Sequence, residues 1–137
     1  MHDIPIDHIM TPDPATVSPQ SSAAEARRLL DSNVINHLPV VEDGRLVGIL
    51  SSSDFLKLHL FDGKLPIFAD ATVSQIMETK VIVLQKTSTL RDAAAKLSIG
   101  GFHALPVVDR KKRLIGMVTS SDLIGELVAR LDGRRAG

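Results

Sequence analysis

The sequence LPVVEDGRLVGILSSSD, residues 38–54, occurs a second time as LPVVDRKKRLIGMVTSSD, residues 105–122. The two copies align at an offset of 67 before the central turn (Pro39 to Pro106) and 68 after it (Asp54 to Asp122). The extra residue falls in the turn, where an insertion costs least. The sequence therefore predicts one structural unit used twice, and this repeat decides the fold.

Local signals around the repeated stretch predict the elements of each copy. Residues 38–41 and 46–50 are apolar runs separated by Asp43-Gly44, which is typical of a β-hairpin. Upstream, Ser22-Ala23-Ala24-Glu25 and Thr89-Leu90-Arg91-Asp92 have the form of capping boxes before helically spaced apolar residues. Residues 15–17 form a short extended candidate, and a second helix is expected after Ser51 and again from about Ser120. Each copy reads β-α-β-β-α, so the predicted fold class is α+β.

Length and composition limit the classes of function. The chain has 137 residues, 44% of them hydrophobic, and equal numbers (16 each) of basic and acidic residues. This balance argues against a nucleic-acid partner and against a polybasic membrane binder. There are no cysteines, and no apolar run is long enough for a transmembrane helix. The first residues lack the pattern of a signal peptide, so a cytoplasmic protein is expected.

The repeat also predicts the domain organisation. Residues 1–66 form the first repeat with its linker, and residues 67–137 form the second. A unit of this size buries too little surface to be stable alone. The two repeats are therefore expected to pack on each other as one module.

A hydroxyl and a carboxylate three residues apart stand in both copies where a strand leads into a helix. These are Ser51 with Asp54, and Thr119 with Asp122. The start of a helix attracts anions, and a carboxylate can accept two hydrogen bonds from the diol of a ribose. The alternative is that these residues only cap their helices, since Ser, Thr and Asp are preferred there.

The chain resembles a tandem pair of CBS domains over residues 4–131. The resemblance is carried by Ile9-Met10 and Ile76-Met77, by the repeated Leu-Pro-Val-Val strands, and by the two turns that end in Asp54 and Asp122. It implies that the repeats pack through their sheets around a pseudo-two-fold axis and leave two clefts. In the family such clefts often bind AMP, ADP, ATP or S-adenosylmethionine, with the ribose against the Asp of one unit and the base against the other unit.

The resemblance also implies which residues line each cleft. One cleft would contain Thr11, Ala15, Ile35, Asn36, His37, Thr119, Ser121 and Asp122, and the other would contain Lys80, Ile82, Phe102, His103, Ser51, Ser53 and Asp54. Ile35 and Phe102 occupy aligned positions and either cover a base or pack in the core. His37 and His103 contact a ligand or serve as hydrogen-bonded structural residues. Glu78 replaces Thr11 in the second copy, and an acid near phosphates is unfavourable, so the clefts are not expected to be equivalent.

Other signals are weaker. The basic run Arg110–Arg113 is expected to be a solvated turn, and the spacing of His2, Asp3, Asp7 and His8 fits no dedicated metal motif. No catalytic constellation and no resident cofactor are predicted. The leading hypothesis is a non-enzymatic regulatory module that senses an adenosyl ligand and signals to a separate effector protein, and the resemblance implies that it is a homodimer. The alternative is a dimerising interaction module that binds no nucleotide, and an enzyme is a third hypothesis.

Overall fold

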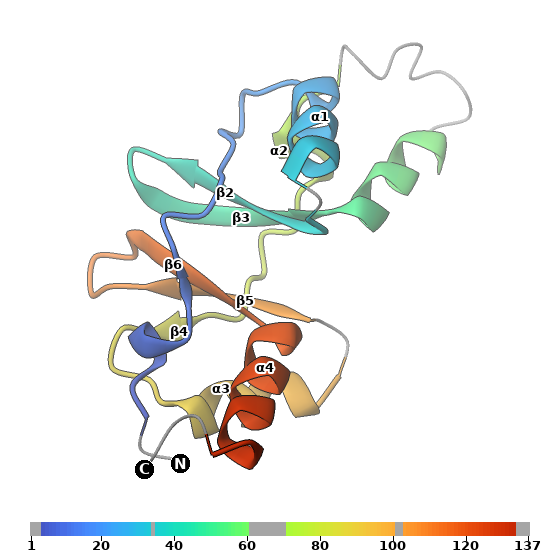
Figure 1. The fold of residues 1–137 in the computed structure, drawn as a ribbon. Helices are drawn as coiled ribbons and strands as arrows, with labels where there is room; N and C mark the ends of the chain where they lie inside the picture. Colours follow the sequence, from blue (N-terminus) through green and yellow to red (C-terminus); the bar gives the residue numbers. More distant parts are fainter. Residues whose placement is uncertain (1–3, 34, 61–70, 101–102, 134–137) are drawn as a thin grey trace. The chain divides into compact units, whose positions relative to one another are not determined.

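The computed structural model describes residues 4–33, 35–60, 71–100 and 103–133 (Figure 1). Two compact units are distinguished, Ala15–Val81 and Met1–Pro14 with Ile82–Gly137, and each is described by itself. In chain order the elements are η1 (Ile6–His8), β1 (Thr11–Pro12), α1 (Ala23–Asn33), β2 (His37–Glu42), β3 (Arg45–Ser51), η2 (Ser52–Leu60), α2 (Val73–Ile76), β4 (Leu84–Gln85), α3 (Leu90–Ser98), β5 (Ala104–Val108), β6 (Leu114–Thr119) and α4 (Ser120–Leu131). This mixture of helices and sheets confirms the α+β fold class.

The unit Ala15–Val81 is built on the hairpin of β2 and β3. Its turn residues Asp43 and Gly44 both have positive φ, 53° and 81°, which is the conformation that a two-residue hairpin turn requires. The hairpin predicted from the Asp-Gly pair is therefore confirmed. The predicted strand at residues 15–17 is reduced to one parallel bridge between Val17 and Val40.

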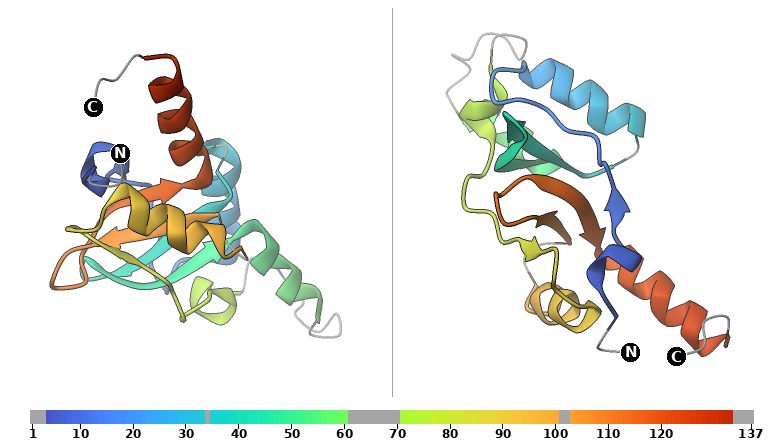
Figure 2. Two further views of the ribbon diagram at one scale, coloured as in Figure 1. Left: turned by 90° about the horizontal axis from the view of Figure 1, so that it is seen from below. Right: turned by 90° about the vertical axis from the view of Figure 1, so that its left-hand side faces the viewer.

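Three helices complete this unit. The start of α1 is confirmed, because Ser22 Oγ accepts a hydrogen bond of 3.0 Å from the Glu25 N–H. Figure 1 and Figure 2 show α1 and α2 on the same side of the hairpin. The Arg27 guanidinium lies 5.5 Å from the centre of the Phe55 ring and so joins α1 to η2. The buried core consists of Val17, Ala23, Ala26, Leu30, Leu38, Val40, Leu50, Phe55, Ala71, Val73 and Ile76.

The other unit has a four-stranded sheet in the order β1-β6-β5-β4. β5 and β6 form the second hairpin, and β4 runs parallel to β5. Capping boxes at Thr89 and Thr119 begin α3 and α4, and α4 ends at Leu131, with Asp132 as its C-cap before Gly133, which has a φ of 71°. Both helix starts agree with the sequence. The core contains Ile6, Leu84, Ala93, Leu105, Val107 and Val118.

The first residues of each repeat pack in the unit that holds the hairpin of the other repeat. Met10 lies against Gly116, where a Cβ would meet its sulfur at 2.5 Å. In the same way, Met77 lies against Gly48, where a Cβ would meet its sulfur at 2.7 Å. The glycines therefore make room for methionine side chains that arrive from the opposite repeat. The predicted boundary between residues 66 and 67 lies outside the described residues.

One predicted helix differs from the expected form. The helix after Ser51 is the 3-10 helix η2, whereas its counterpart α4 is an α-helix. In α4 the Asp122 N–H donates to Thr119 Oγ1, and in the described part of the chain no such bond runs from Asp54 N–H to Ser51 Oγ. The first turn of η2 therefore lacks a bond that helps to start an α-helix.

Candidate functional site

The two turns singled out in the sequence stand at equivalent places, where β3 leads into η2 and β6 leads into α4. At the second turn the Thr119 N–H donates to Asp122 Oδ2 over 2.8 Å, and the Asp122 N–H donates to Thr119 Oγ1 over 3.1 Å. The capping role is therefore confirmed. No described residue makes a hydrogen bond or ion pair with Asp122 Oδ1. The carboxylate thus has one oxygen fixed by the backbone and a second oxygen that can accept hydrogen bonds.

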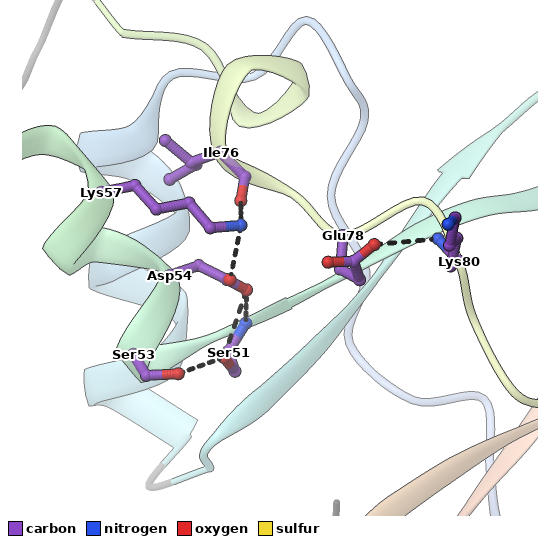
Figure 3. A network of polar contacts seen from close by, with 7 residues as sticks. All are labelled: Ser51, Ser53, Asp54, Lys57, Ile76, Glu78 and Lys80. Carbon is purple, nitrogen blue, oxygen red and sulfur yellow. Dashed lines mark hydrogen bonds and ion pairs between the residues drawn. The ribbon is translucent and has the colours of Figure 1, made fainter. Parts of the chain in front are cut away.

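At the first turn both carboxylate oxygens of Asp54 are engaged. Oδ2 accepts from the Ser51 N–H at 2.7 Å and from Ser51 Oγ at 3.1 Å, and Ser53 Oγ lies 2.9 Å from Ser51 Oγ. Oδ1 is paired with Lys57 Nζ at 3.0 Å. The same ammonium donates to the carbonyl oxygen of Ile76 at 2.9 Å, so it lies between two acceptors (Figure 3).

The counterpart of Lys57 in the second copy is Gly125, at the offset of 68 that relates Asp54 to Asp122. A Cβ built on Gly125 would have no atom within 4 Å apart from its own helix and neighbours. The two turns therefore differ in one charged group. At the first turn the Lys57 ammonium pairs with the carboxylate oxygen that does not bind the backbone. At the second turn the position of that side chain, at Gly125, is open.

A second difference lies in the segment that pairs with β6 in one unit and with β3 in the other. Thr11 in β1 pairs with Met117 in β6, two residues before Thr119. Glu78 takes the equivalent place beside Ile49 in β3, with backbone hydrogen bonds of 2.9 Å in both directions. Its carboxylate accepts the Lys80 N–H at 3.1 Å (Figure 3). An acid near the first turn and a neutral hydroxyl near the second make the second turn more favourable for an anionic ligand.

Of the remaining predicted residues of the unit Ala15–Val81, some pack against the core and others lie beside the first turn. Ala15 and Ile35 are half-buried and pack against the core cluster, and the contact of Ile35 with a base stays a prediction. The carbonyl of Asn36 accepts the Ser52 N–H at 3.1 Å, and His37 stands opposite Ser51 in the hairpin. Asn36 and His37 therefore lie beside the first turn of their own unit.

In the other unit three further predicted residues lie in the described part and one lies outside it. Ile82 is half exposed, and His103 and Ser121 are exposed. The His103 carbonyl accepts the Ser120 N–H at 2.9 Å, which places this residue beside the second turn. Phe102 lies outside the described residues. Each predicted cleft combines residues of both units, so its assembly stays a prediction.

The basic run lies where the sequence placed it, on the turn between β5 and β6. All four residues of Arg110–Arg113 are exposed. Asp109 organises this turn, because its carboxylate accepts hydrogen bonds from the N–H groups of Lys111 and Arg113 and from Arg113 Nε. Above all, the Arg113 backbone N–H holds the pKa of Asp109 below its ordinary value.

Two further classes of site were sought in the part of the chain that the structure describes. No group of three or more His, Asp or Glu side chains there could hold a metal ion, and His2 and Asp3 lie outside it. Of the helices in the described ranges, none combines the length and the apolar character needed to cross a membrane.

Sequence reasoning missed the residues that distinguish the two turns. Lys57 and Gly125 follow the aspartates by three residues, and comparison of the aligned copies one helical turn further would have paired them. It also missed an exposed apolar stripe on α4. The stripe consists of Ile124, Leu127, Val128 and Leu131, spaced along one helix face and between 44% and 77% exposed.

Comparisons with protein families and curated proteins agree over most of the chain. The family model for the CBS domain matches residues 6–60 and 73–129. A CBS domain-containing protein of Dictyostelium discoideum is 32% identical over 93% of both chains. A homoserine O-acetyltransferase of Methanocorpusculum labreanum is 38% identical over 86% of this chain, but over only 23% of its own length. The uncharacterized protein MJ1225 of Methanocaldococcus jannaschii is matched over 45% of its length at 32% identity. The chain therefore spans less than half of these two longer relatives.

Two solved structures match nearly end to end. CBSX2 in complex with AMP is 31% identical, with a TM-score of 0.80 over 96% of this chain and 99% of that one. The CBS domain pair of protein MJ0100, in complex with 5′-methylthioadenosine and S-adenosyl-L-methionine, is 32% identical, with a TM-score of 0.76 over 96% and 98%. Both structures share the arrangement of elements described above.

Proposed function

The chain belongs to the CBS domain family, and on that premise we propose that it is a regulatory module that binds an adenine nucleotide or a related adenosyl ligand. Support comes from the solved relatives, since CBSX2 holds AMP and the MJ0100 pair holds 5′-methylthioadenosine and S-adenosyl-L-methionine. The observation that carries the proposal is the carboxylate of Asp122, which is fixed through Oδ2 and presents Oδ1 without a partner among the described residues.

The second turn offers the groups that a nucleoside phosphate needs. Asp122 Oδ1 accepts hydrogen bonds from the 2′- and 3′-hydroxyls of a ribose. The Thr119 hydroxyl accepts from the Asp122 N–H, so its own proton is available for a phosphate oxygen. The positive end of the α4 dipole adds a favourable field for the anion. The base is proposed to lie against Ala15, Ile35 and the residues before β2.

Ligand binding is proposed to change how the repeats pack, and a homodimer partner or a separate effector reads that change. A ligand shifts such an equilibrium only as far as its affinities for the two arrangements differ. The chain itself is proposed to have no catalytic turnover. The acetyltransferase and sulfurtransferase activities of longer relatives belong to proteins of which this chain spans less than a quarter.

The first test is a thermal-shift screen with AMP, ADP, ATP, S-adenosylmethionine and 5′-methylthioadenosine. A ligand at 100 times its Kd stabilises the folded state by about 2.7 kcal/mol, which is readily visible as a higher Tm. The variant Asp122→Asn keeps an oxygen for the Thr119 N–H and loses the second acceptor. It is expected to weaken binding about 10-fold to 100-fold and to leave the Tm of the free protein nearly unchanged.

The matched ligand control is 2′-deoxy-AMP, which lacks one of the two hydroxyls that Asp122 is proposed to bind. It should bind the wild type more weakly than AMP does, and Asp122→Asn should narrow that difference. Absence of a shift with every compound, or equal binding of AMP by the wild type and Asp122→Asn, contradicts the proposed site.

A second candidate function, a dimerising interaction module without a ligand, is favoured by the apolar stripe on α4. Leu131 is 77% exposed and Ile124 is 61% exposed, at positions that share one helix face. A second copy of this chain is the occupant that we propose for the stripe. A dimer that Leu127→Glu dissociates, in a protein that no adenosyl compound stabilises, would favour this candidate.

A further inference from the structure

We propose that the Lys57 ammonium blocks ligand binding at the first turn by pairing with Asp54, and that the chain therefore binds one adenosyl ligand, at the turn of Asp122. This inference rests on the proposed function and adds which of the two turns is active. It comes from the pairing of Lys57 with Asp54, which has no counterpart at Gly125.

The Lys57 ammonium occupies the atom that a ribose would need. Asp54 Oδ2 is already bound to the N–H and hydroxyl of Ser51, so Oδ1 is the remaining acceptor. Lys57 Nζ lies 3.0 Å from Oδ1, and the Ile76 carbonyl holds it from the other side at 2.9 Å (Figure 3). A ribose that used Oδ1 would therefore have to displace the ammonium from both the carboxylate and the Ile76 carbonyl.

Glu78 acts in the same direction. It forms an isolated β-bridge with Ile49 of β3, where the equivalent residue beside β6 is Thr11. Its negative charge repels a phosphate near the first turn, whereas the uncharged Thr11 does not repel a phosphate near the second. Two independent substitutions between the repeats, Lys57 for Gly125 and Glu78 for Thr11, thus disfavour a ligand at the same turn.

The exchange of these residues gives a direct test. Gly125→Lys places an ammonium three residues after Asp122, as Lys57 stands after Asp54, and the added Cβ meets open space. Lysine has a higher helix propensity than glycine, so the Tm of the free protein should rise, by about 4 °C. AMP binding, measured by isothermal titration calorimetry, should weaken about 10-fold or more. Loss of binding with a higher Tm cannot result from unfolding.

The matched control is Gly125→Met, which adds a side chain of similar length without a charge. It should keep wild-type affinity for AMP and raise the Tm in the same way. In the opposite direction, Lys57→Met combined with Glu78→Thr frees Asp54 Oδ1 and removes the nearby acid. This double variant is expected to bind a second molecule of AMP per chain, where the wild type binds one.

The outcomes of these titrations distinguish failure of the role proposed for Lys57 from failure of the proposed ligand-binding function. Two molecules of AMP bound per wild-type chain, wild-type affinity in Gly125→Lys, or a single site in the double variant would each overturn the role of Lys57 and leave the ligand-binding function intact. Parallel titrations with S-adenosylmethionine apply the same criteria to the other ligand class. If the wild type binds neither compound, the proposed function fails and this inference fails with it.

Discussion

Two turns of nearly the same sequence, Ser51–Asp54 and Thr119–Asp122, lead into different helices and use their carboxylates differently. In both, the aspartate accepts the backbone N–H three residues earlier, at 2.7 Å and 2.8 Å. The second carboxylate oxygen is paired with Lys57 in one unit, and no described residue pairs with it in the other. The hydrogen bond from the backbone N–H to one carboxylate oxygen is thus the same in both repeats. The repeats differ in whether the other carboxylate oxygen is available to a ligand.

The packing of methionine on glycine is the feature in which the two units agree most closely, and its disruption has the largest expected effect. In Gly116→Ala the new Cβ meets Met10 Sδ and also a backbone oxygen of Thr11 at 3.0 Å. Overpacking of this kind costs about 2 kcal/mol of unfolding free energy. Gly48→Ala should cost slightly less, because its Cβ meets Met77 Sδ at the longer distance of 2.7 Å. Urea denaturation of both variants measures the difference.

A second substitution tests the cause. Met10→Ala removes the side chain that the Gly116→Ala methyl group meets, so the double variant should be more stable than the sum of the two single changes predicts. Met77→Ala should do the same for Gly48→Ala. Strictly additive free energies in either pair would show that the glycines are needed for another reason.

How far the sequence predicted this structure depends on the range of each interaction. Asp43-Gly44 and the Thr89 capping box act within four residues, and both elements formed as predicted. The contact of Met10 with Gly116 joins residues far apart in the chain, and hydrophobic patterning does not indicate which copy of a strand a methionine will meet. The exchange of the first residues between the repeats was therefore not predicted.

The candidate site shows the same limit. The capping bonds of Asp122 were predicted from residue types and are confirmed, whereas its contact with a ligand stays a prediction. The pairing of Lys57 with both Asp54 and the Ile76 carbonyl depends on how η2 lies against the end of α2, which the sequence does not specify. A 3-10 helix follows the first turn and an α-helix follows the second, and of these two turns the second alone has the N-cap bond from an Asp N–H to the hydroxyl three residues earlier.

The N-cap bond is the next point of comparison, with a smaller expected effect. Thr119→Ala removes the acceptor of the Asp122 N–H and should lower the free energy of unfolding by about 1 kcal/mol. Ser51→Ala should cost less, because Ser51 Oγ bonds to side chains of Ser53 and Asp54 rather than to a helix N–H. Urea denaturation gives both values, and Thr119→Ser should retain most of the stability. A loss at Ser51 as large as that at Thr119 would mean that the two turns are capped alike.

The smallest expected effect concerns the turns of the two hairpins. The longer turn carries Asp109, whose carboxylate accepts the N–H of Arg113, and this bond lowers the pKa of Asp109 from its ordinary value of 3.8. A carboxyl group whose pKa is lower in the folded state stabilises the fold at a pH above its unfolded value. That contribution is lost as the pH falls below 3.8 and through the folded pKa.

In an NMR titration the Asp109 carboxyl carbon should therefore have its midpoint below 3.8. Arg113→Ala removes the bond from Nε and keeps the backbone N–H, so the midpoint should rise and still remain below 3.8. A midpoint at or above 3.8 in the wild type would mean that the extra residue of this turn is not held by the Asp109 carboxylate.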